Sequence, residues 1–505
     1  MTRTPHEAYD ELIRLSRETA LLESCFSLLG WDHKTYMPPK GSAHRAEQIA
    51  LLAGMIHQRV TDPKVGELLA IVEASDLARE AAAPAAVNVR EIRRTYDRET
   101  KVPEALVTEL ARTCTQAEDV WVEARKQSDF ARFRPWLEKV VGLKRQEAQA
   151  LSDGGPLYDA LLDAYEPGET SANLARVFAA LREDLVPLVQ AIQGSGRQPD
   201  LSILQREYPI PAQEAFGRAA AAAIGFDFEA GRLDVTTHPF CSGIGPGDTR
   251  LTTRYNVHDF VDAFFGVLHE TGHGLYDQGL DPAQFGTPMG SAVSLGIHES
   301  QSRLWENLVG RSRAFWEHFY PQARQSFPGP LGHVSLDAFL FAVNDVRPSF
   351  IRTEADEVTY NLHVLLRFEL EQALIEGDLK VGDVPGAWNE TLKRHLGLTP
   401  PDDRRGCLQD IHWSGGAFGY FPTYTLGNLY AAQLFAQARR DLGDLEAMFR
   451  RGEFQPLLGW LQAKIHRLGQ RHRAADLVRV VTGEPLHHRY LLGHLRGKFG
   501  PLFGI

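Results

Sequence analysis

The sequence predicts one large, mostly α-helical unit over residues 1–505, with two lobes flanking a central cleft and a small β-hairpin or sheet. Apolar residues recur with a helical period from about residue 7 to 224 and again from about 424 to the end. Between these regions, residues 233–255 carry β-branched side chains on either side of a glycine-rich turn, which is typical of a hairpin. No serine-, glycine- or proline-rich run divides the chain, so we expect a single unit without separable domains.

Charge and cysteine content narrow the functional classes. The chain has 54 Lys+Arg against 65 Asp+Glu, a net charge of −11, and this acidic balance argues against nucleic acid as a partner. No segment predicts a membrane span, and the N-terminus lacks the apolar core of a signal peptide. The four cysteines are scattered without metal-binding spacing, which favours a reducing compartment and predicts a cytoplasmic protein.

Two histidines four residues apart form the most informative motif. On a helix, His269 and His273 lie on one face, one turn apart, where both imidazoles can bind one metal ion. Glu270 follows the first histidine and can take a proton from a water molecule bound to that ion. This is the minimal equipment of a zinc peptidase, although two solvated histidines on an ordinary helix would give the same pattern.

The surrounding residues predict a long, buried helix for this motif. Asn256 is the expected N-cap, apolar residues recur at the helical period from Val257 to Tyr276, and Gly279 is the expected stop. Buried histidines and a buried glutamate need partners, and a metal ion supplies them.

A downstream acidic residue can complete the ligand set. We expect a second helix from Ser294 to Tyr320, ended by Pro321, and its Glu299 can face the histidines if the two helices run antiparallel. A glutamate in a first helical turn can also serve only to stabilise the helix dipole. His298 is the alternative ligand, but it points to a different side of the helix from Glu299.

Several ordered segments make the chain resemble the thermostable metallocarboxypeptidases of the carboxypeptidase Taq type. The matching segments are His238-Pro239-Phe240, Asp248–Thr252, His269–His273, His298–Ser300, Ile351–Asp356, Gly406–Trp413 and the N-terminal Gly30-Trp31-Asp32 and Met37-Pro38-Pro39. Their order and the chain length are similar to that family from end to end.

The resemblance implies a site, a fold and an activity. The metal ligands would be His269, His273 and Glu299, and Glu270 would be the general base. The fold would be the mostly helical, cleft-bearing architecture shared with neurolysin-like and angiotensin-converting-enzyme-like peptidases. Members of the family are usually homodimers that release single C-terminal residues with broad side-chain tolerance. Zinc suits two imidazoles and a carboxylate, with one ion per chain, although cobalt or manganese could also bind.

The segment from residue 412 to 424 offers donors for the opposite wall of the site. Peptide hydrolysis requires that the developing oxyanion be stabilised, and a phenol or an imidazole can do this. We assign the role to His412 and Tyr420, with Tyr424 as the rival. Glycines in the segment suit a tight loop, and a packed aromatic loop without catalytic function is the alternative.

A carboxypeptidase must also bind a free carboxylate, which arginine does best because its planar fork matches two oxygens. Arg352 is the expected clamp, and a buried structural ion pair, for example with Asp356 at i+4, is the alternative. Arg250 also lies in a family segment and could bind substrate, or instead brace Asp248. His238 precedes a proline at the expected cleft edge and could touch the substrate backbone.

The sequence therefore predicts a metal-dependent carboxypeptidase that acts on peptides with a free C-terminus. An exposed strand edge within residues 233–255 could bind an extended peptide by strand addition. A metallo-endo-oligopeptidase on the same fold is the nearest alternative. A non-catalytic helical scaffold that binds peptides is an alternative of another class.

Overall fold

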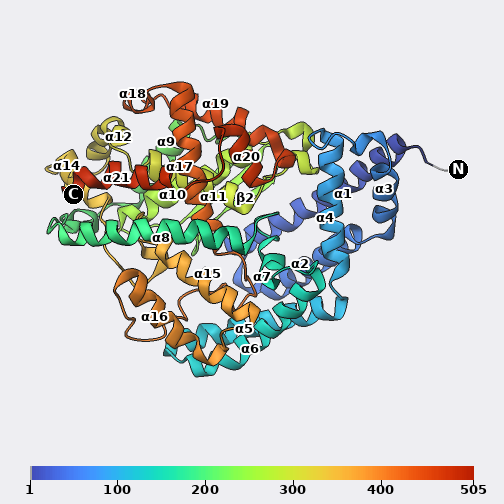
Figure 1. Ribbon diagram of the computed structural model, residues 1–505. Helices are drawn as coiled ribbons and strands as arrows, with labels where there is room; N and C mark the ends of the chain where they lie inside the picture. Colours follow the sequence, from blue (N-terminus) through green and yellow to red (C-terminus); the bar gives the residue numbers. More distant parts are fainter. Residues whose placement is uncertain (1–2) are drawn as a thin grey trace.

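The computed structural model describes residues 3–505 and is 70% helical, with one small sheet (Figure 1). The mostly α prediction is therefore confirmed. The main buried core is continuous and is built from residues between Ala117 and Phe503. None of the helices within the described residues is long and apolar enough to cross a membrane.

The first part of the chain forms nine helices. They are α1 (Pro5–Lys34), α2 (Ser42–Val60), α3 (Pro63–Glu73), α4 (Pro84–Lys101), α5 (Glu104–Gln127), α6 (Phe130–Leu151), α7 (Leu157–Leu162), α8 (Ser171–Gly194) and α9 (Ile210–Ile224). A second, smaller core joins α1, α3 and α4 through buried residues such as Leu12, Leu68 and Val72.

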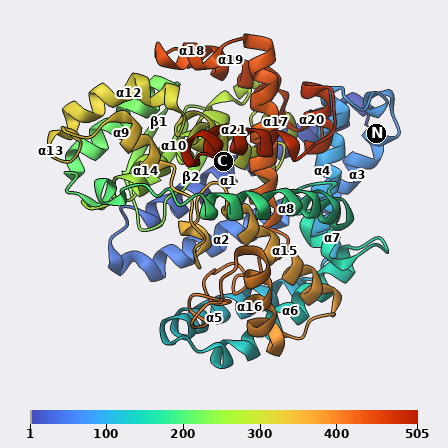
Figure 2. The ribbon, with the colours of Figure 1, turned by 60° about the vertical axis from the view of Figure 1, so that its left-hand side comes forward.

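Three strands and the remaining helices follow. They are β1 (Gly231–Val235), β2 (Cys241–Gly245), β3 (Asp248–Thr253), α10 (Phe260–Gly279), α11 (Leu295–Arg303), α12 (Arg313–Ser326), α13 (Pro328–Leu331), α14 (Leu336–Val343), α15 (Tyr360–Glu376), α16 (Val384–Leu396), α17 (Pro422–Leu442), α18 (Leu445–Arg450), α19 (Gln455–Lys464), α20 (Ala474–Thr482) and α21 (Arg489–Phe503). In both ribbon views α5, α6 and α16 gather at one end of the molecule, and α12, α18 and α19 lie at the opposite end (Figure 2).

The sheet has the strand order β1-β3-β2 and lies against α10. Strands β2 and β3 are antiparallel and form the predicted hairpin around Gly247, which has a positive φ of 82°. Strand β1 pairs in parallel with β3, with Leu233 opposite Leu251. Close packing requires a glycine on α10, because a Cβ at Gly274 would lie 2.8 Å from Leu251 Cδ2. The predicted binding of a peptide to an edge of this sheet stays a prediction.

The helix that carries the two histidines begins later than predicted. Asp259, and not Asn256, is the N-cap of α10, since its side chain accepts the amide hydrogen of Asp262. Asn256 instead accepts the amide of His258 and closes a turn before the helix. At the other end, α10 stops at Gly279, as predicted, and a Cβ there would lie 2.2 Å from His466 Nδ1.

The prediction of one helix from Ser294 to Tyr320 is wrong. Helix α11 ends at Arg303, a π-helical turn spans Leu304–Val309, and α12 starts at Arg313 with Ser312 as its N-cap. The amide of Gly310 donates to the carbonyl of Trp305, which closes the π turn. Pro321 does not end a helix but lies inside α12.

Candidate metal centre

The structure brings His269, His273 and Glu299 into one cluster. Helix α10 presents both imidazoles on the face that meets α11, and Glu299 Oε2 lies 3.7 Å from His269 Nε2 and 3.4 Å from His273 Nε2. One ligand atom from each residue lies within 4.8 Å of the others. Ligand atoms about 2.0–2.2 Å from a tetrahedral zinc ion are roughly 3.4 Å apart, so this donor set fits a divalent ion.

The protonation of His273 and Glu299 also suits a metal ion. Burial lowers the pKa of His273 to about 4, which keeps its imidazole neutral at pH 7. Burial works to raise the pKa of Glu299, but Arg303 and His269 outweigh it and hold that pKa well below its usual range. A neutral imidazole and an ionised carboxylate are the forms that bind metal.

The second ring nitrogen of each histidine is held by a neighbouring side chain. His269 Nδ1 lies 2.9 Å from Glu306 Oε2, and His273 Nδ1 lies 2.6 Å from His298 Nδ1. His298 in turn contacts Asp277 Oδ1 through its Nε2 at 3.1 Å. His298, which was predicted as the alternative ligand, therefore contacts the ligand His273. Such contacts fix the ring orientation of metal-binding histidines.

Two further charged residues, Arg303 and Glu306, contact the ligands Glu299 and His269, and the sequence did not predict these contacts. Arg303 Nε donates to Glu299 Oε1 at 2.7 Å, and its NH1 donates to Glu306 Oε2 at 3.3 Å. The i+4 spacing from Glu299 to Arg303 is a usable signal, since it places both on one helix face. Glu306 has a weaker signal, because it lies inside the π turn, where the register of the helix changes.

Glu270 lies beside the ligand cluster and does not belong to it. Its side chain is buried, with 7% exposure, and burial raises its pKa to about 7. The nearby His269 lowers this pKa, while the negative charges of Glu299 and Glu306 raise it. A carboxyl group with a pKa near the working pH can both accept and return a proton.

Helix α17 forms the opposite wall and packs tightly on α11. A Cβ at Gly427 would lie 2.5 Å from Glu299 Cγ, so only glycine permits this approach. The packing brings the segment 412–424 to the cluster, where His412 Nε2 lies 3.2 Å from the Tyr424 hydroxyl. The rings of Tyr420 and Tyr424 are 5.3 Å apart between centroids. The structure thus groups the three predicted residues of this wall.

Burial controls the protonation of this wall. It raises the pKa of Tyr424 well above its usual value and also raises that of Tyr420, so both phenols keep their protons. It lowers the pKa of His412 to about 4, so the imidazole is neutral. All three side chains can therefore donate or accept a hydrogen bond without carrying charge.

Arg352 is buried, with 5% exposure, and forms an ion pair with Asp410, which was not predicted as its partner. Its Nε and NH2 donate to Asp410 Oδ1 at 3.1 and 2.9 Å, and its NH1 donates to the Tyr360 hydroxyl at 2.9 Å. The contacts of Arg352 are thus those of the alternative, a buried ion pair, but the partner is not Asp356, which accepts from Val358 and Thr359 at the start of the next helix.

The buried charges around Arg352 do not cancel. Arg367 Nε also donates to Asp410, to Oδ2 at 2.6 Å, so one carboxylate faces two guanidinium groups. The guanidinium of Arg352 lies 4.9 Å from the centre of the Tyr424 ring. A positive charge in excess therefore lies next to the loop that carries His412 and Tyr424.

The other two predicted substrate residues lie at the sheet. Arg250 donates to both carboxylate oxygens of Asp248 at 2.8 Å and stacks over Trp31 at 4.3 Å, so the bracing alternative describes its contacts. His238 is exposed in the connection between β1 and β2. Neither side chain belongs to the ligand cluster, which consists of His269, His273 and Glu299.

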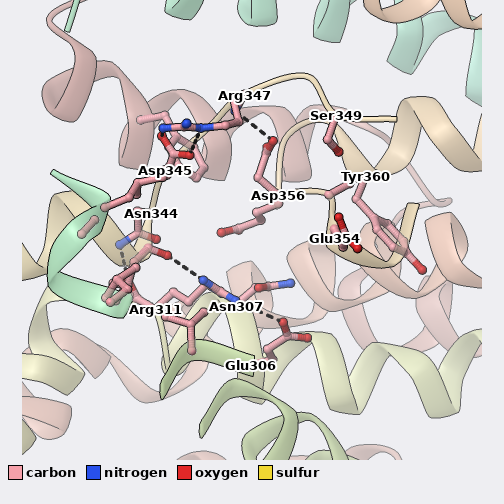
Figure 3. A pocket seen from close by; sticks show the side chains of 18 of the residues that line it. Glu306, Asn307, Arg311, Asn344, Asp345, Arg347, Ser349, Glu354, Asp356 and Tyr360 are labelled. Atoms are coloured by element: carbon pink, nitrogen blue, oxygen red, sulfur yellow. Dashed lines mark hydrogen bonds and ion pairs between the residues drawn. The ribbon is translucent and has the colours of Figure 1, made fainter. Parts of the chain in front are cut away.

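A pocket of about 390 Å³ opens beside the metal-binding cluster (Figure 3). Glu306, Arg303 and Tyr360 are among its polar lining residues, and Leu201, Val261 and Phe499 are among its apolar ones. Arg347 and Asp356 line it from the segment that precedes α15. The pocket therefore offers both charged and apolar contacts to a side chain.

Comparison with known proteins places these features in context. The family description that matches residues 11–499 is "Carboxypeptidase Taq (M32) metallopeptidase". The chain is 53% identical to thermostable carboxypeptidase 1 of Thermus thermophilus, covering 99% of this chain and 100% of the relative. It is 40% identical to carboxypeptidase 1 of Bacillus subtilis, covering 98% of each.

Solved structures agree with the sequence relatives. The crystal structure of the M32 carboxypeptidase from Deinococcus radiodurans R1 has a TM-score of 0.95 and 41% identity, covering 99% of this chain and 100% of that one. A carboxypeptidase of Pyrococcus furiosus has a TM-score of 0.94 and 35% identity, covering 98% and 99%. This likeness confirms the predicted fold class.

Proposed function

This chain belongs to the carboxypeptidase Taq (M32) metallopeptidase family and is a metallocarboxypeptidase, and on that premise we propose how it works and on what. It releases single C-terminal residues from peptides with broad side-chain tolerance, and His269, His273 and Glu299 hold one zinc ion per chain. The convergence of these three ligand atoms within 4.8 Å, with Glu270 beside them, carries the proposal.

The residues around the ligands have separate roles in proton transfer and in positioning the ligands. A zinc ion bound there would polarise the peptide carbonyl and lower the pKa of a water ligand to about 7. Glu270 takes a proton from the attacking water and returns it to the leaving amine. Glu306 and His298 hold the two ligand histidines in position, and Arg303 keeps Glu299 ionised.

The opposite wall stabilises the oxyanion that forms as water attacks. Tyr424 and Tyr420 retain their protons and can donate to it, and His412 contacts the Tyr424 hydroxyl. Tyr424 is the stronger candidate, because its contact with His412 fixes the direction of its hydroxyl. Donors that are fixed before the reaction stabilise the transition state without reorganisation.

The excess positive charge next to this wall supports recognition of a free C-terminus. Arg352 is the more exposed of the two arginines that pair with Asp410 and provides the clamp, supported by Tyr360. The family resemblance supports broad side-chain specificity. Arg250 and His238 lie further out, where they could limit or touch longer peptides.

Paired peptides test this function. The metal-loaded enzyme is incubated with N-blocked tripeptides that differ only in a free or an amidated C-terminus, and released amino acids are quantified. Release from the free acids, and nearly none from the amides, is the expected result. Internal cleavage of both sets would favour an endo-oligopeptidase. A protein that binds the peptides and cleaves neither would favour the non-catalytic scaffold.

We also propose a cytoplasmic homodimer. The family resemblance supports the dimer, and the outer face of α1 and α2 carries several exposed apolar side chains that could be buried in it. These residues are Leu21, Phe26, Leu28, Leu51 and Met55. The four free cysteines are consistent with a reducing compartment. Sedimentation of the wild type and of Leu51→Glu tests the dimer, which predicts a monomer for the variant.

A further inference from the structure

Glu371 is a buried carboxylate that the proposed chemistry does not use. It lies on α15, is 0% exposed, and accepts three hydrogen bonds. Trp413 Nε1 donates to its Oε1 at 2.8 Å, while the amide of Gly419 and the hydroxyl of Tyr158 donate to its Oε2 at 3.0 and 2.8 Å. Within residues 3–505 it takes part in no ion pair. Its three donors are therefore all neutral.

Two of these donors belong to the loop of the opposite wall, and their positions in the sequence are informative. Trp413 directly follows His412, and Gly419 directly precedes Tyr420. The same carboxylate therefore holds the loop at both ends, each time one residue away from a side chain that faces the site. Within the loop, the amide of Ala417 donates to the carbonyl of His412, so the segment also closes on itself.

Packing strengthens this anchor. A Cβ at Gly419 would lie 2.8 Å from the backbone nitrogen of Leu162 on α7, and Gly419 has a positive φ of 90°. Trp413 stacks on Phe418 with their planes 6° apart. The loop has little freedom to move while Glu371 accepts from both of its ends.

We propose that Glu371 is a positioning residue, which pins the loop 412–424 so that His412, Tyr420 and Tyr424 face the metal-binding cluster. The proposal rests on the function assigned above to this loop. It makes Glu371 act through the loop and not through contact with the substrate.

The donors dictate how Glu371 would respond to substitution. A tryptophan N–H and a backbone N–H can only donate. A glutamine at 371 must turn its NH2 group toward one of them, whichever way its amide is oriented, so one loop anchor is lost. Glu166 is a matched control, since it is 1% exposed and also accepts three neutral donors.

Glu166 differs from Glu371 in the chemistry of its hydrogen-bond donors. Two of the donors to Glu166 are hydroxyl groups, of Ser294 and Tyr430, and both contact the same oxygen, Oε1. Hydroxyl groups can rotate and accept, so Glu166→Gln keeps every contact. The same isosteric change is therefore expected to disturb position 371 and to spare position 166.

The first experiment compares variants that each lack one hydrogen-bond donor to Glu371. Trp413→Phe removes a loop anchor, and Tyr158→Phe removes a donor that lies outside the loop. Trp316→Phe controls for loss of an indole, because Trp316 is buried in the core and its Nε1 has no partner among the described residues. We expect Trp413→Phe to lower kcat by about 10-fold or more with bound metal unchanged, because small displacements of reacting groups cost this much. The two controls stay within about 3-fold.

The second experiment is a double-mutant cycle. Glu371→Gln is expected to lower kcat in the wild-type background and to add little in the Trp413→Phe background, because the conflicting N–H is then absent. Amide hydrogen exchange of residues 412–424 should be faster in Glu371→Gln than in Glu166→Gln. A gain in flexibility that affects the whole chain equally would contradict a specific anchor.

The outcomes separate the two proposals. Equal kcat values for Trp413→Phe, Tyr158→Phe and Trp316→Phe would overturn the positioning role, and this holds even if Glu371→Gln fails to fold. If Tyr420→Phe and Tyr424→Phe nevertheless lower kcat, the function assigned to the loop stands. If those two variants are also fully active, the proposed function of the loop fails.

Discussion

The two walls of the site are built by different means. On the ligand wall, α10 and α11 supply His269, His273 and Glu299, and charged neighbours such as Glu306 and Arg303 hold them. On the loop wall, an irregular segment and the first turn of α17 supply neutral donors. Helical spacing therefore fixes one half of the site locally, and the other half depends on contacts with distant parts of the chain.

The largest expected effect comes from Glu270, which the proposal assigns to the ligand wall as the proton carrier. Glu270→Gln removes the proton acceptor and leaves the three ligands in place. We expect kcat to fall by about 10²- to 10⁴-fold, the range of general-base catalysis, with one metal ion per chain retained. Steady-state kinetics and elemental analysis of the same sample measure both quantities. Near-normal turnover would refute the role of Glu270.

The next effect tests the loop wall. Tyr424→Phe removes the hydroxyl that contacts His412, and the loss of one oxyanion donor costs about 10²- to 10³-fold in kcat. Metal affinity should not change, because the phenol is not in the ligand set. Tyr420→Phe is the matched variant, and a larger loss for Tyr420 than for Tyr424 would reverse our assignment between them.

A smaller effect is expected from the neighbour of a ligand. Glu306→Gln weakens the orientation of His269, and changes at such positions typically lower metal affinity or activity about 10- to 100-fold. Competition with a chelator measures the affinity of the wild type and the variant. Glu317→Gln, which removes an ion pair of the surface residue Arg450, is the control. Equal affinities in Glu306→Gln and the control would remove Glu306 from the metal site.

The smallest effect concerns stability and pH. Burial raises the pKa of both Glu166 and Glu371 from 4.5 to about 7. Between these values the folded chain keeps protons that the unfolded chain releases, so the free energy of unfolding falls as pH rises from 4.5 to 7. One pKa unit corresponds to about 1.4 kcal/mol. Urea unfolding at pH 5 and pH 8 should show a smaller difference for Glu166→Gln than for the wild type, and identical differences would contradict this assignment.

The contrast between the walls also explains what the sequence can predict. The i, i+4 histidines and the helical period sufficed to predict the helix and a shared metal face, and the structure groups the three candidate ligands. The predicted start of α10 was a few residues too early. Asn256 and Asp259 are both good N-cap residues, and only tertiary packing decides between them.

Residues that act through distant contacts were beyond the reach of sequence patterns. The carboxylate that pairs with Arg352 is Asp410, 58 positions away, whereas local spacing suggested Asp356. Glu371 lies on a helix that is buried on nearly all sides, so no amphipathic pattern distinguishes it. The break after Arg303 was missed because the apolar residues of the π turn, Leu304, Trp305, Leu308 and Val309, keep a spacing that is also typical of an α-helix.

The most direct test of the account is the metal content of the purified protein and of Glu299→Ala, each dialysed against buffer with trace zinc. Elemental analysis should give one zinc ion per chain for the wild type and far less for the variant, because three ligands are needed to retain the ion. Equal zinc in both proteins, or none in an active wild type, would contradict the metal site on which the function depends.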